Sequence, residues 1–275
     1  MVKPTKEQGA ILAESAYFMG RQSGEFKKKK DRVARVNNWL EESGISNDYT
    51  FIPSSSNTNM SVFHANDDPQ NITIAYRGTI PRHGKRSSQD LATDIGFAAG
   101  LGKLQPDLQR RTERTNDIIK ELKPTNLNLV GHSLGGIANN YVIANSKKVR
   151  KNLTSSQTYN AGFNPVFASG VTVSDKNKEK LKKKVTHYTV KGDPVSFGAR
   201  GAFKEAGVPF GKTKMQEHKY EKGMLDKGVA KFVLDNTIIG DMIGVGTTTL
   251  KGLHAHGLDQ FYDVPPPKEN DAKKE

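Results

Sequence analysis

Residues 127–143 read LNLVGHSLGGIANNYVI and combine a strand-like run, a glycine-rich turn and a helix-like run. Residues 127–130 form a short, mostly apolar run typical of a strand, whereas residues 137–143 carry apolar side chains at helical spacing. The segment GHSLG at 131–135 fits the G-x-S-x-G pattern of a sharp strand-to-helix elbow, in which the hydroxyl of Ser133 projects from the turn. The alternative is an ordinary glycine-rich turn in which Ser133 only caps the helix.

Strand-like and helix-like segments alternate on both sides of this elbow. Helices are predicted over residues 5–21, over a lysine-rich segment that ends at Gly44, and from about residue 104 to residue 122. The other predicted strands are MSVFHAN (60–66), NITIAYRG (71–78), SSQTYNAGF (155–163) and KVTHYTV (184–190). The first two form a hairpin, and the rest alternate with helices. This order predicts an α/β fold, with a mostly parallel sheet after an antiparallel start and helices on both faces.

The composition is that of one globular domain. The chain has 275 residues, of which 35% are hydrophobic, which is enough for a single core. We expect one domain over residues 1–263, followed by a charged, proline-rich and disordered tail over residues 264–275. The chain has no cysteine, which excludes disulfides, thiolate catalysis and cysteine-ligated metal sites.

The termini and the apolar segments bear on localisation. The first residues lack the apolar core of a secretory signal peptide, and no segment is long and apolar enough to span a bilayer. We therefore expect a cytoplasmic protein or one exported by a non-Sec route.

The charge of the chain points to anionic partners. The formal net charge is +13, with lysine runs at residues 27–30 and 178–184. Such an excess attracts anionic lipid headgroups or nucleic acid, although each run alone is also consistent with a solvated surface. The runs contain few interleaved aromatic or arginine residues, and no nucleic-acid-binding module is recognisable, which argues against nucleic acid. Peripheral contact with an anionic membrane surface remains as an expectation.

A serine hydroxyl at an elbow becomes a nucleophile only with two partners. A histidine must take its proton, and a carboxylate must orient that histidine. In folds with this elbow the order is Ser, acid, His. Asp193 directly follows the predicted strand at 184–190 and is the candidate acid; the alternative is a turn aspartate before Pro194. Asp175 lies among lysines, which favours a surface role.

Two histidines follow Asp193 near the end of the predicted domain, His254 and His256. Either has the correct order for the base. Of the other histidines considered, His132 is expected to point away from its neighbour Ser133, His187 lies inside a predicted strand, and His218 lies in a polar, solvent-exposed context.

An acyl-transfer site also needs two donors for the oxyanion that forms on the substrate. The backbone N–H of Leu134, directly after Ser133, is the first candidate. Thr79, which follows the strand NITIAYRG, is the second, through its N–H and also its hydroxyl.

Five motifs in this order resemble the class 3 lipase family of α/β-hydrolases. They are IAYRGT (74–79), LATDIGF (91–97), VGHSLGG (130–136), GDPVS (192–196) and HGLDQF (256–261). GHSLGG alone is shared with other α/β-hydrolases, but YRGT before it and GDPV after it make the combination specific to this family. The resemblance covers about residues 60–262 and implies an α/β-hydrolase-like fold.

The resemblance also implies roles for individual residues. Ser133 would be the nucleophile, Asp193 the acid and His256 the base, with Thr79 and Leu134 forming the oxyanion hole. The aromatic residue a few positions after His256 matches the family and supports it over His254. The implied activity is a lipase or esterase that forms an acyl-enzyme and requires neither metal nor organic cofactor.

Two departures from the family pattern concern the substrate. Tyr76 stands where the strand motif has Phe, which is a mild change. The segment that forms a lid in the family reads PRHGKRSSQDLATD (81–94) here and is basic rather than apolar. A basic lid favours phospholipids, and hence a phospholipase A1-like or lysophospholipase-like activity. The main alternative is a non-catalytic, basic membrane- or polyanion-binding protein on the same scaffold; an acyltransferase or peptidase on this scaffold is a third.

Overall fold

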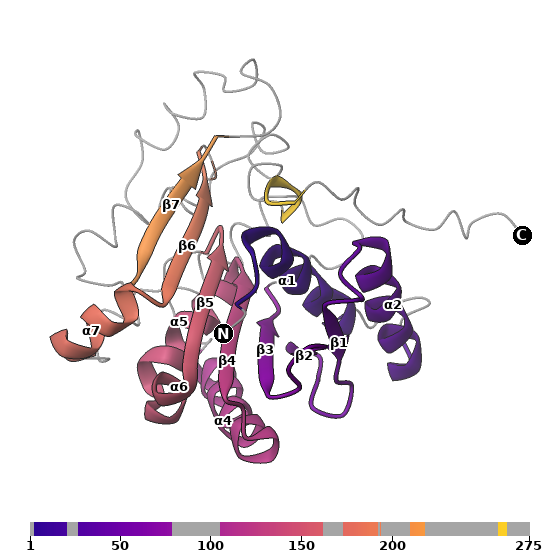
Figure 1. Cartoon of the computed structure of the whole chain (residues 1–275), viewed down its shortest axis with the longest axis horizontal. Coiled ribbons are helices and arrows are strands. Elements are labelled where there is room, and N and C mark those ends of the chain that lie inside the picture. Colours follow the sequence, from indigo (N-terminus) through magenta and orange to yellow (C-terminus); the bar gives the residue numbers. More distant parts are fainter. Residues whose placement is uncertain are drawn as a thin grey trace, which may run out of the picture.

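The computed structural model describes residues 3–20, 27–78, 105–161, 173–191, 193, 210–217 and 258–262. Seven strands of these residues form a sheet in which the spatial order equals the chain order, from β1 to β7 (Figure 1). Strands β1 to β3 pair antiparallel, and each later strand pairs parallel with the one before it. The strands are β1 Tyr49–Phe51, β2 Met60–Ala65, β3 Asn71–Tyr76, β4 Asn126–His132, β5 Leu153–Tyr159, β6 Val185–Val190 and β7 Lys212–Gln216.

Helices cover both faces of this sheet. The bounds are α1 Lys6–Gly20, α2 Lys29–Glu42, α4 Gln105–Leu122, α5 Leu134–Asn145, α6 Lys147–Asn152, α7 Asp175–Lys182 and the short 3₁₀ helix η3 Leu258–Gln260. Because the parallel strands advance in one direction, right-handed crossovers place α4, α5 and α7 on the same face. Helices α1 and α2, together with η3, cover the other face (Figure 1).

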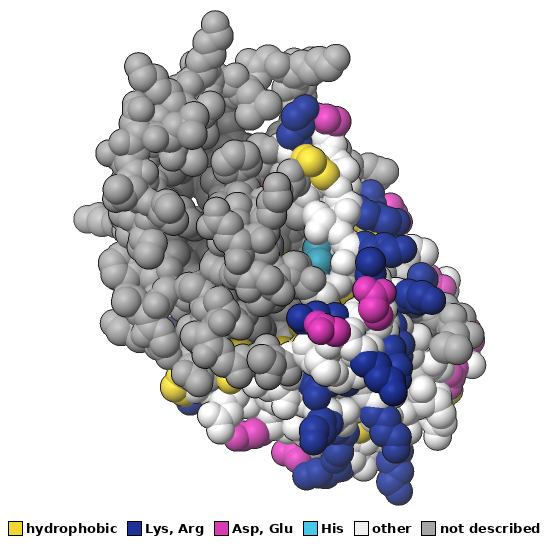
Figure 2. Space-filling model, turned by 90° about the vertical axis from the view of Figure 1, so that its left-hand side faces the viewer, with side chains coloured by type: hydrophobic (Ala, Val, Ile, Leu, Met, Phe, Trp, Pro, Cys, Tyr) yellow, Lys and Arg dark blue, Asp and Glu magenta, His cyan; other side chains and the backbone are white. Residues whose placement is uncertain are grey.

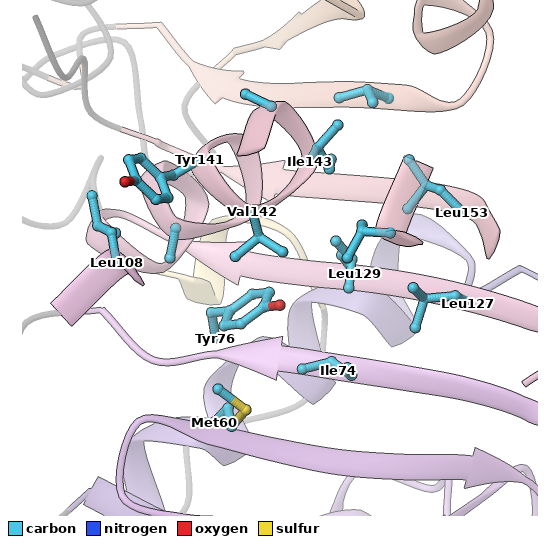
Figure 3. Close-up of a cluster of buried hydrophobic side chains, with 14 of the residues drawn as sticks. Met60, Ile74, Tyr76, Leu108, Leu127, Leu129, Tyr141, Val142, Ile143 and Leu153 are labelled. Carbon is cyan, nitrogen blue, oxygen red and sulfur yellow. The ribbon is translucent and has the colours of Figure 1, made fainter. Parts of the chain in front are cut away.

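The two faces alternate along β3. Ile72, Ile74 and Tyr76 point toward α4 and α5, where they meet Leu108 and Val142 (Figure 3). The intervening Ala75 belongs to the core under α1 and α2. Since each fully buried large apolar side chain contributes about 1.5–3 kcal/mol, these two cores fix the register of the central strands.

Most elements follow the predictions. The α/β class, the antiparallel start, the parallel remainder and the helices on both faces are confirmed. The second predicted helix, α2, ends at Glu42, two residues before the predicted end at Gly44, and Ser43 is its C-cap; the φ of 70° at Gly44 suits a glycine just after a helix. The segments 81–94 and 264–275 lie outside the described residues. No helix in the described part of the chain combines the length and apolarity needed to cross a membrane.

Some elements were not predicted. Strands β1 and β7 and helices α6 and α7 were missed, and most of the lysine run 178–184 lies on α7. Strand β7 reads KTKMQ, with no residue fully buried. It lies at the edge of the described sheet, where exposed lysines are tolerated and apolar alternation is not needed.

Candidate active site

Ser133 occupies a strained turn between β4 and α5. Its φ is 54° and its ψ is −122°, a conformation that side-chain-bearing residues rarely adopt. The surrounding backbone holds it there: the Ser133 N–H donates to the Tyr159 carbonyl at 3.0 Å, and the Ser133 carbonyl accepts from the Gly136 and Ile137 N–H groups at 2.9 and 3.2 Å. The turn is thus the predicted elbow, fixed from both sides.

Three glycines of the elbow are required by close approach. A Cβ atom on Gly131 would lie 2.4 Å from the Gly135 carbonyl oxygen, and one on Gly135 would lie 2.0 Å from the Tyr76 carbonyl oxygen. A Cβ atom on Gly136 would lie 2.6 Å from the Ala161 Cβ. Any side chain here would push α5 away from β3 and β5. The glycines therefore bring the amino end of α5 against the ends of the strands.

The Ser133 side chain is not used as a helix cap. It makes no capping hydrogen bond to α5, and the helix-cap alternative is therefore wrong. The hydroxyl is buried, and within the described ranges no group accepts from or donates to it. Since the first N–H groups of a helix have no partner within the helix, the N–H of Leu134 and the positive end of the α5 dipole lie beside this hydroxyl.

Asp193 lies three residues beyond the end of β6 and is fully buried. Its N–H donates to the Val190 carbonyl at 3.2 Å, which folds the chain back at the strand end. The side-chain oxygen of Asn160 accepts from the Val190 N–H at 3.0 Å and so ties the ends of β5 and β6 together. Ser133 and Asp193 therefore both lie at the carboxyl ends of the parallel strands, after β4 and β6, with β5 between them.

His132 precedes Ser133 but faces another partner. Its Nδ1 lies 2.8 Å from the hydroxyl oxygen of Tyr17, on α1. His64 on β2 is 3.0 Å from the carbonyl of Ala65 through its own Nδ1. Neither imidazole has a hydrogen bond to Ser133.

His187 is buried within β6 between two polar partners. Its Nδ1 lies 2.8 Å from the Thr158 hydroxyl and its Nε2 lies 3.1 Å from the Phe210 carbonyl. Burial lowers the pKa of His187 below its ordinary value. Both ring nitrogens are thus used by neighbours that fix a neutral imidazole.

The predicted base His256, its alternative His254 and the predicted oxyanion residue Thr79 all lie outside the described residues, as does His218. The described chain resumes at Leu258, two residues after His256. There Phe261 packs against the ring of Tyr159, with ring centroids 5.0 Å apart. Tyr159 is the residue whose carbonyl binds the Ser133 N–H, so the segment that follows His256 packs beside the elbow.

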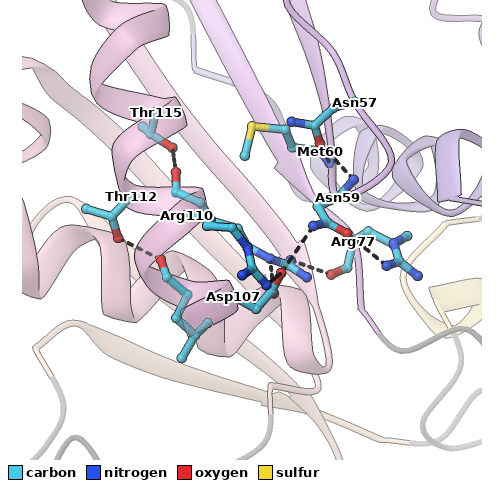
Figure 4. A network of polar contacts seen from close by, with 10 residues as sticks. Asn57, Asn59, Met60, Arg77, Asp107, Arg110, Thr112 and Thr115 are labelled. Atoms are coloured by element: carbon cyan, nitrogen blue, oxygen red, sulfur yellow. Dashed lines mark hydrogen bonds and ion pairs between the residues drawn. The ribbon is translucent and has the colours of Figure 1, made fainter. Parts of the chain in front are cut away.

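A polar network at the end of β3 was not predicted. Figure 4 shows Asn59, Arg77 and Asp107 gathered where β3 ends and α4 begins. Arg77 donates to the Asn59 side-chain oxygen at 2.9 Å, and Asp107 accepts from Asn59 and from Arg111. Burial lowers the pKa of Arg77, and the neighbouring Arg111 lowers it further. The members of the network lie up to 52 positions apart in the sequence, from Asn59 to Arg111, so no local pattern identifies it.

Within the described ranges no three His, Asp or Glu side chains gather closely enough to hold a metal ion. The elbow itself presents a hydroxyl and a helix amino end, and the buried carboxyl of Asp193 lies beyond β5.

Comparison with known proteins supports a lipase-like identity at the level of the family. A family model described as a Tle-like phospholipase domain matches residues 8–238. No curated protein and no solved structure matches the chain. The matched range contains Ser133 and Asp193 and ends before His254 and His256. It supports a phospholipase-like family that acts on lipid esters, and it does not single out the class 3 lipases. Because the match covers most of the chain, this protein belongs to the family of Tle-like phospholipase domains.

Proposed function

We propose that this protein is a serine hydrolase that cleaves the carboxylic esters of phospholipids. The observation that carries the proposal is the geometry of Ser133: a strained elbow, a buried hydroxyl that does not cap the helix, and the amino end of α5 beside it. Strain of this kind is retained where the fold needs a side chain aimed at a particular point. Membership of a phospholipase-like family supports the substrate class.

In the proposed reaction the Ser133 oxygen attacks the acyl carbonyl carbon while His256 accepts the hydroxyl proton. Asp193 orients the imidazole and stabilises its protonated form. The N–H groups of Leu134 and Thr79 stabilise the oxyanion. Collapse of the tetrahedral intermediate breaks the ester bond, and the departing lysophospholipid alcohol takes the proton from His256. Water, deprotonated by His256, then attacks the acyl-enzyme; the fatty acid leaves, and His256 returns the proton to the Ser133 oxygen.

Two observations support His256 or His254 as the base. The three histidines of the described ranges, His64, His132 and His187, each have another partner. The segment that follows His256 packs on Tyr159, next to the elbow. The order Ser, Asp, His is that of the α/β-hydrolases, and the class 3 lipase motifs support the same assignment.

The headgroup preference is proposed from charge. The segment 81–94 is basic, and the whole chain carries a net charge of +13. Cationic surroundings favour esters whose headgroup carries a phosphate. We therefore propose that anionic phospholipids are preferred over neutral glycerides, in an activity of the phospholipase A1 or lysophospholipase kind.

A fluorescent fluorophosphonate tests the nucleophile. We expect it to label the wild-type protein and not the Ser133→Ala variant, because the alanine removes the attacking oxygen. His256→Ala and His254→Ala, compared on a short-chain p-nitrophenyl ester, distinguish the two bases: the true base should lower kcat by at least about 10³-fold. A folded wild type that neither labels nor hydrolyses phospholipid would contradict the proposal.

The same charge suggests how the enzyme reaches a bilayer. We define the outer face as the exposed lysines that lie on, or directly after, α6, α7, β6 and β7, and these lysines gather along one side of the molecule (Figure 2). They are Lys147, Lys151, Lys176, Lys178, Lys180, Lys182, Lys183, Lys191, Lys212 and Lys214. The same elements expose three carboxylates, those of Asp175, Glu179 and Glu217. We propose that the outer face contacts anionic lipid headgroups.

A matched pair of variants tests this contact. K176E/K180E/K183E changes three exposed lysines of the outer face, none of which has an ion pair within the described ranges. K28E/K29E/K30E makes the same change of charge before and on α2. Since each lysine near an anionic surface contributes about 1 kcal/mol, the first variant should bind phosphatidylglycerol vesicles at least about tenfold more weakly, with turnover of a soluble ester unchanged. Equally weakened vesicle binding in both variants would show that only the net charge of the protein matters, and would contradict a specific contact through the outer face.

A further inference from the structure

The segment that links β3 to the proposed oxyanion residue Thr79 is held by three side chains from distant parts of the chain. The aim of the residue 79 N–H depends on the backbone of Arg77 and Gly78, because peptide groups are planar and only the intervening dihedrals can turn. A donor for an oxyanion must be fixed before the charge develops. Contacts from Asn59 and Arg111 fix Arg77, and a contact from Tyr17 fixes Gly78.

Both backbone groups of Arg77 are bonded. Its N–H donates to the Asn59 carbonyl at 3.0 Å, and its carbonyl accepts from Arg111 Nη1 at 2.8 Å. The Arg111 Nε donates to the Asp107 carboxylate at 2.7 Å, and the other oxygen of that carboxylate accepts from the Asn59 side chain at 3.1 Å. The Arg111 side chain is buried, so water cannot readily replace its two hydrogen bonds, to the Asp107 carboxylate and to the Arg77 carbonyl. Losing this fork of two bonds would leave buried polar groups unpaired.

Gly78 is held by Tyr17, from α1. The Tyr17 hydroxyl oxygen accepts a hydrogen bond from the Gly78 N–H. It is so close that a Cβ atom on Gly78 would lie 2.1 Å from it and 2.8 Å from the His132 carbonyl oxygen. A glycine is therefore required before the proposed oxyanion donor.

The same hydroxyl also reaches the second strand of the site. It lies 2.8 Å from Nδ1 of His132, the residue before Ser133. Burial, reinforced by Glu14, raises the pKa of Tyr17 well above its usual range, so the phenol keeps its proton. Tyr17 thus bridges the ends of β3 and β4, which carry the two proposed oxyanion donors.

We infer that Tyr17 and Arg111, with Asn59, are positioning residues for the oxyanion hole. They do not touch the substrate. They fix the end of β3, from which the chain leads on to residue 79, relative to the end of β4, which leads to the N–H of Leu134. This role rests on the proposed function, because it has meaning only if an oxyanion forms at the site.

Conservative variants test the inference. Tyr17→Phe keeps the ring and removes the bridge, and Arg111→Lys keeps the charge and removes the fork. We expect each to lower kcat about 10-fold or more with little change in KM, because misplacing a donor weakens binding of the transition state and not of the ground state. The Ki of an alkyl boronic acid, which mimics the tetrahedral oxyanion, should rise in proportion. Tyr49→Phe, which removes the hydroxyl of a buried tyrosine on β1, serves as the control and should leave both constants unchanged.

The outcomes separate the two proposals. If the wild type neither labels with the fluorophosphonate nor turns over, the proposed function fails and the positioning role with it. If the wild type is active while Tyr17→Phe and Arg111→Lys keep its kcat and boronate Ki, only the positioning role is overturned. A lower melting temperature with unchanged kcat and Ki would assign these residues a purely structural role and would likewise overturn it.

Discussion

The end of the sheet around Ser133 and the outer face use positive charge in opposite ways. At the end of β3, Arg77 and Arg111 are largely withdrawn from solvent, and Arg111 is tied to a carboxylate and a carbonyl. On the outer face the lysines are exposed, and the ion pairs on α7, such as Lys178 with Asp175 and Lys182 with Glu179, lie at the surface. The buried arginines hold the backbone at the end of β3 in position, whereas the exposed lysines create a positive electrostatic potential around the outer face.

The difference teaches where a substitution will matter. A planar guanidinium inside the protein holds a backbone carbonyl in one position, and losing it leaves buried polar groups unpaired. An exposed ammonium is hydrated in any rotamer, so its removal costs little stability and changes only the attraction to distant charge. Effects on folding and catalysis should therefore concentrate at the Ser133 end of the sheet.

The largest effect is expected at the elbow. Gly135→Ala would bring a methyl group to 2.0 Å from the Tyr76 carbonyl oxygen, a backbone atom that cannot turn aside. We expect a loss of roughly 3 kcal/mol or more in the free energy of unfolding, together with loss of activity. Gly44→Ala is the control, because its φ is 70° but nothing lies within 4 Å of the added atom. It should cost only about 1 kcal/mol, from backbone strain. Equal costs in urea denaturation would contradict the tight contact between α5 and β3.

An intermediate effect on stability is expected at His187, a buried residue of β6. Its folded-state pKa is lowered, so below about pH 6.5 the unfolded chain binds a proton that the native chain does not. Stability should then fall as the pH falls, by up to about 1.4 kcal/mol per unit until the folded pKa is reached.

His187→Asn removes this titration and tests the assignment. We expect the variant to be less stable at pH 7.5, because it loses a hydrogen-bonded ring, but to lose less further stability on going to pH 5.5 than the wild type does. Parallel loss in both proteins across this range would show that other groups account for the acid sensitivity.

The smallest effect is expected on α7. Lys182→Ala removes an ion pair of 3.6 Å in which both side chains are more than half exposed. The cost should be within about 0.5 kcal/mol, since exposed pairs contribute little. Arg111→Lys, measured in the same urea titrations, should cost clearly more. A loss above 1 kcal/mol for Lys182→Ala would mean that the outer face is part of the structural framework, and the contrast between the two regions would be lost.

The sequence predicted what depends on neighbouring residues. The hairpin, the crossover helix α4 and the elbow each follow from alternation, helical spacing or glycines within a few positions. Strands β1 and β7 were missed because β1 is only three residues long and β7 lacks buried apolar residues, its one large apolar side chain, Met215, being 53% exposed.

The site divides in the same way. The elbow of Ser133 and the position of Asp193 after a strand were predictable, because each is a local strand-to-loop pattern. The bridge from Tyr17 to His132 spans 115 positions, and only the packing of α1 on β4 creates it. The roles of Thr79, His254 and His256 stay predictions.

The small helix η3, near the end of the chain, bears on the order in which the core under α1 and α2 can form. Its neighbour Tyr262 packs against Trp39 on α2, with ring centroids 5.9 Å apart, and Phe261 packs against Tyr159. Trp39 and Tyr159 leave the ribosome well before residues 258–262 do. The contacts of Trp39 and Tyr159 with Tyr262 and Phe261 can therefore form only after the parallel strands have been synthesised. A nascent chain that has made the seven strands of the described sheet therefore still lacks part of the core under α1 and α2, which is complete only once residues 258–262 have been synthesised.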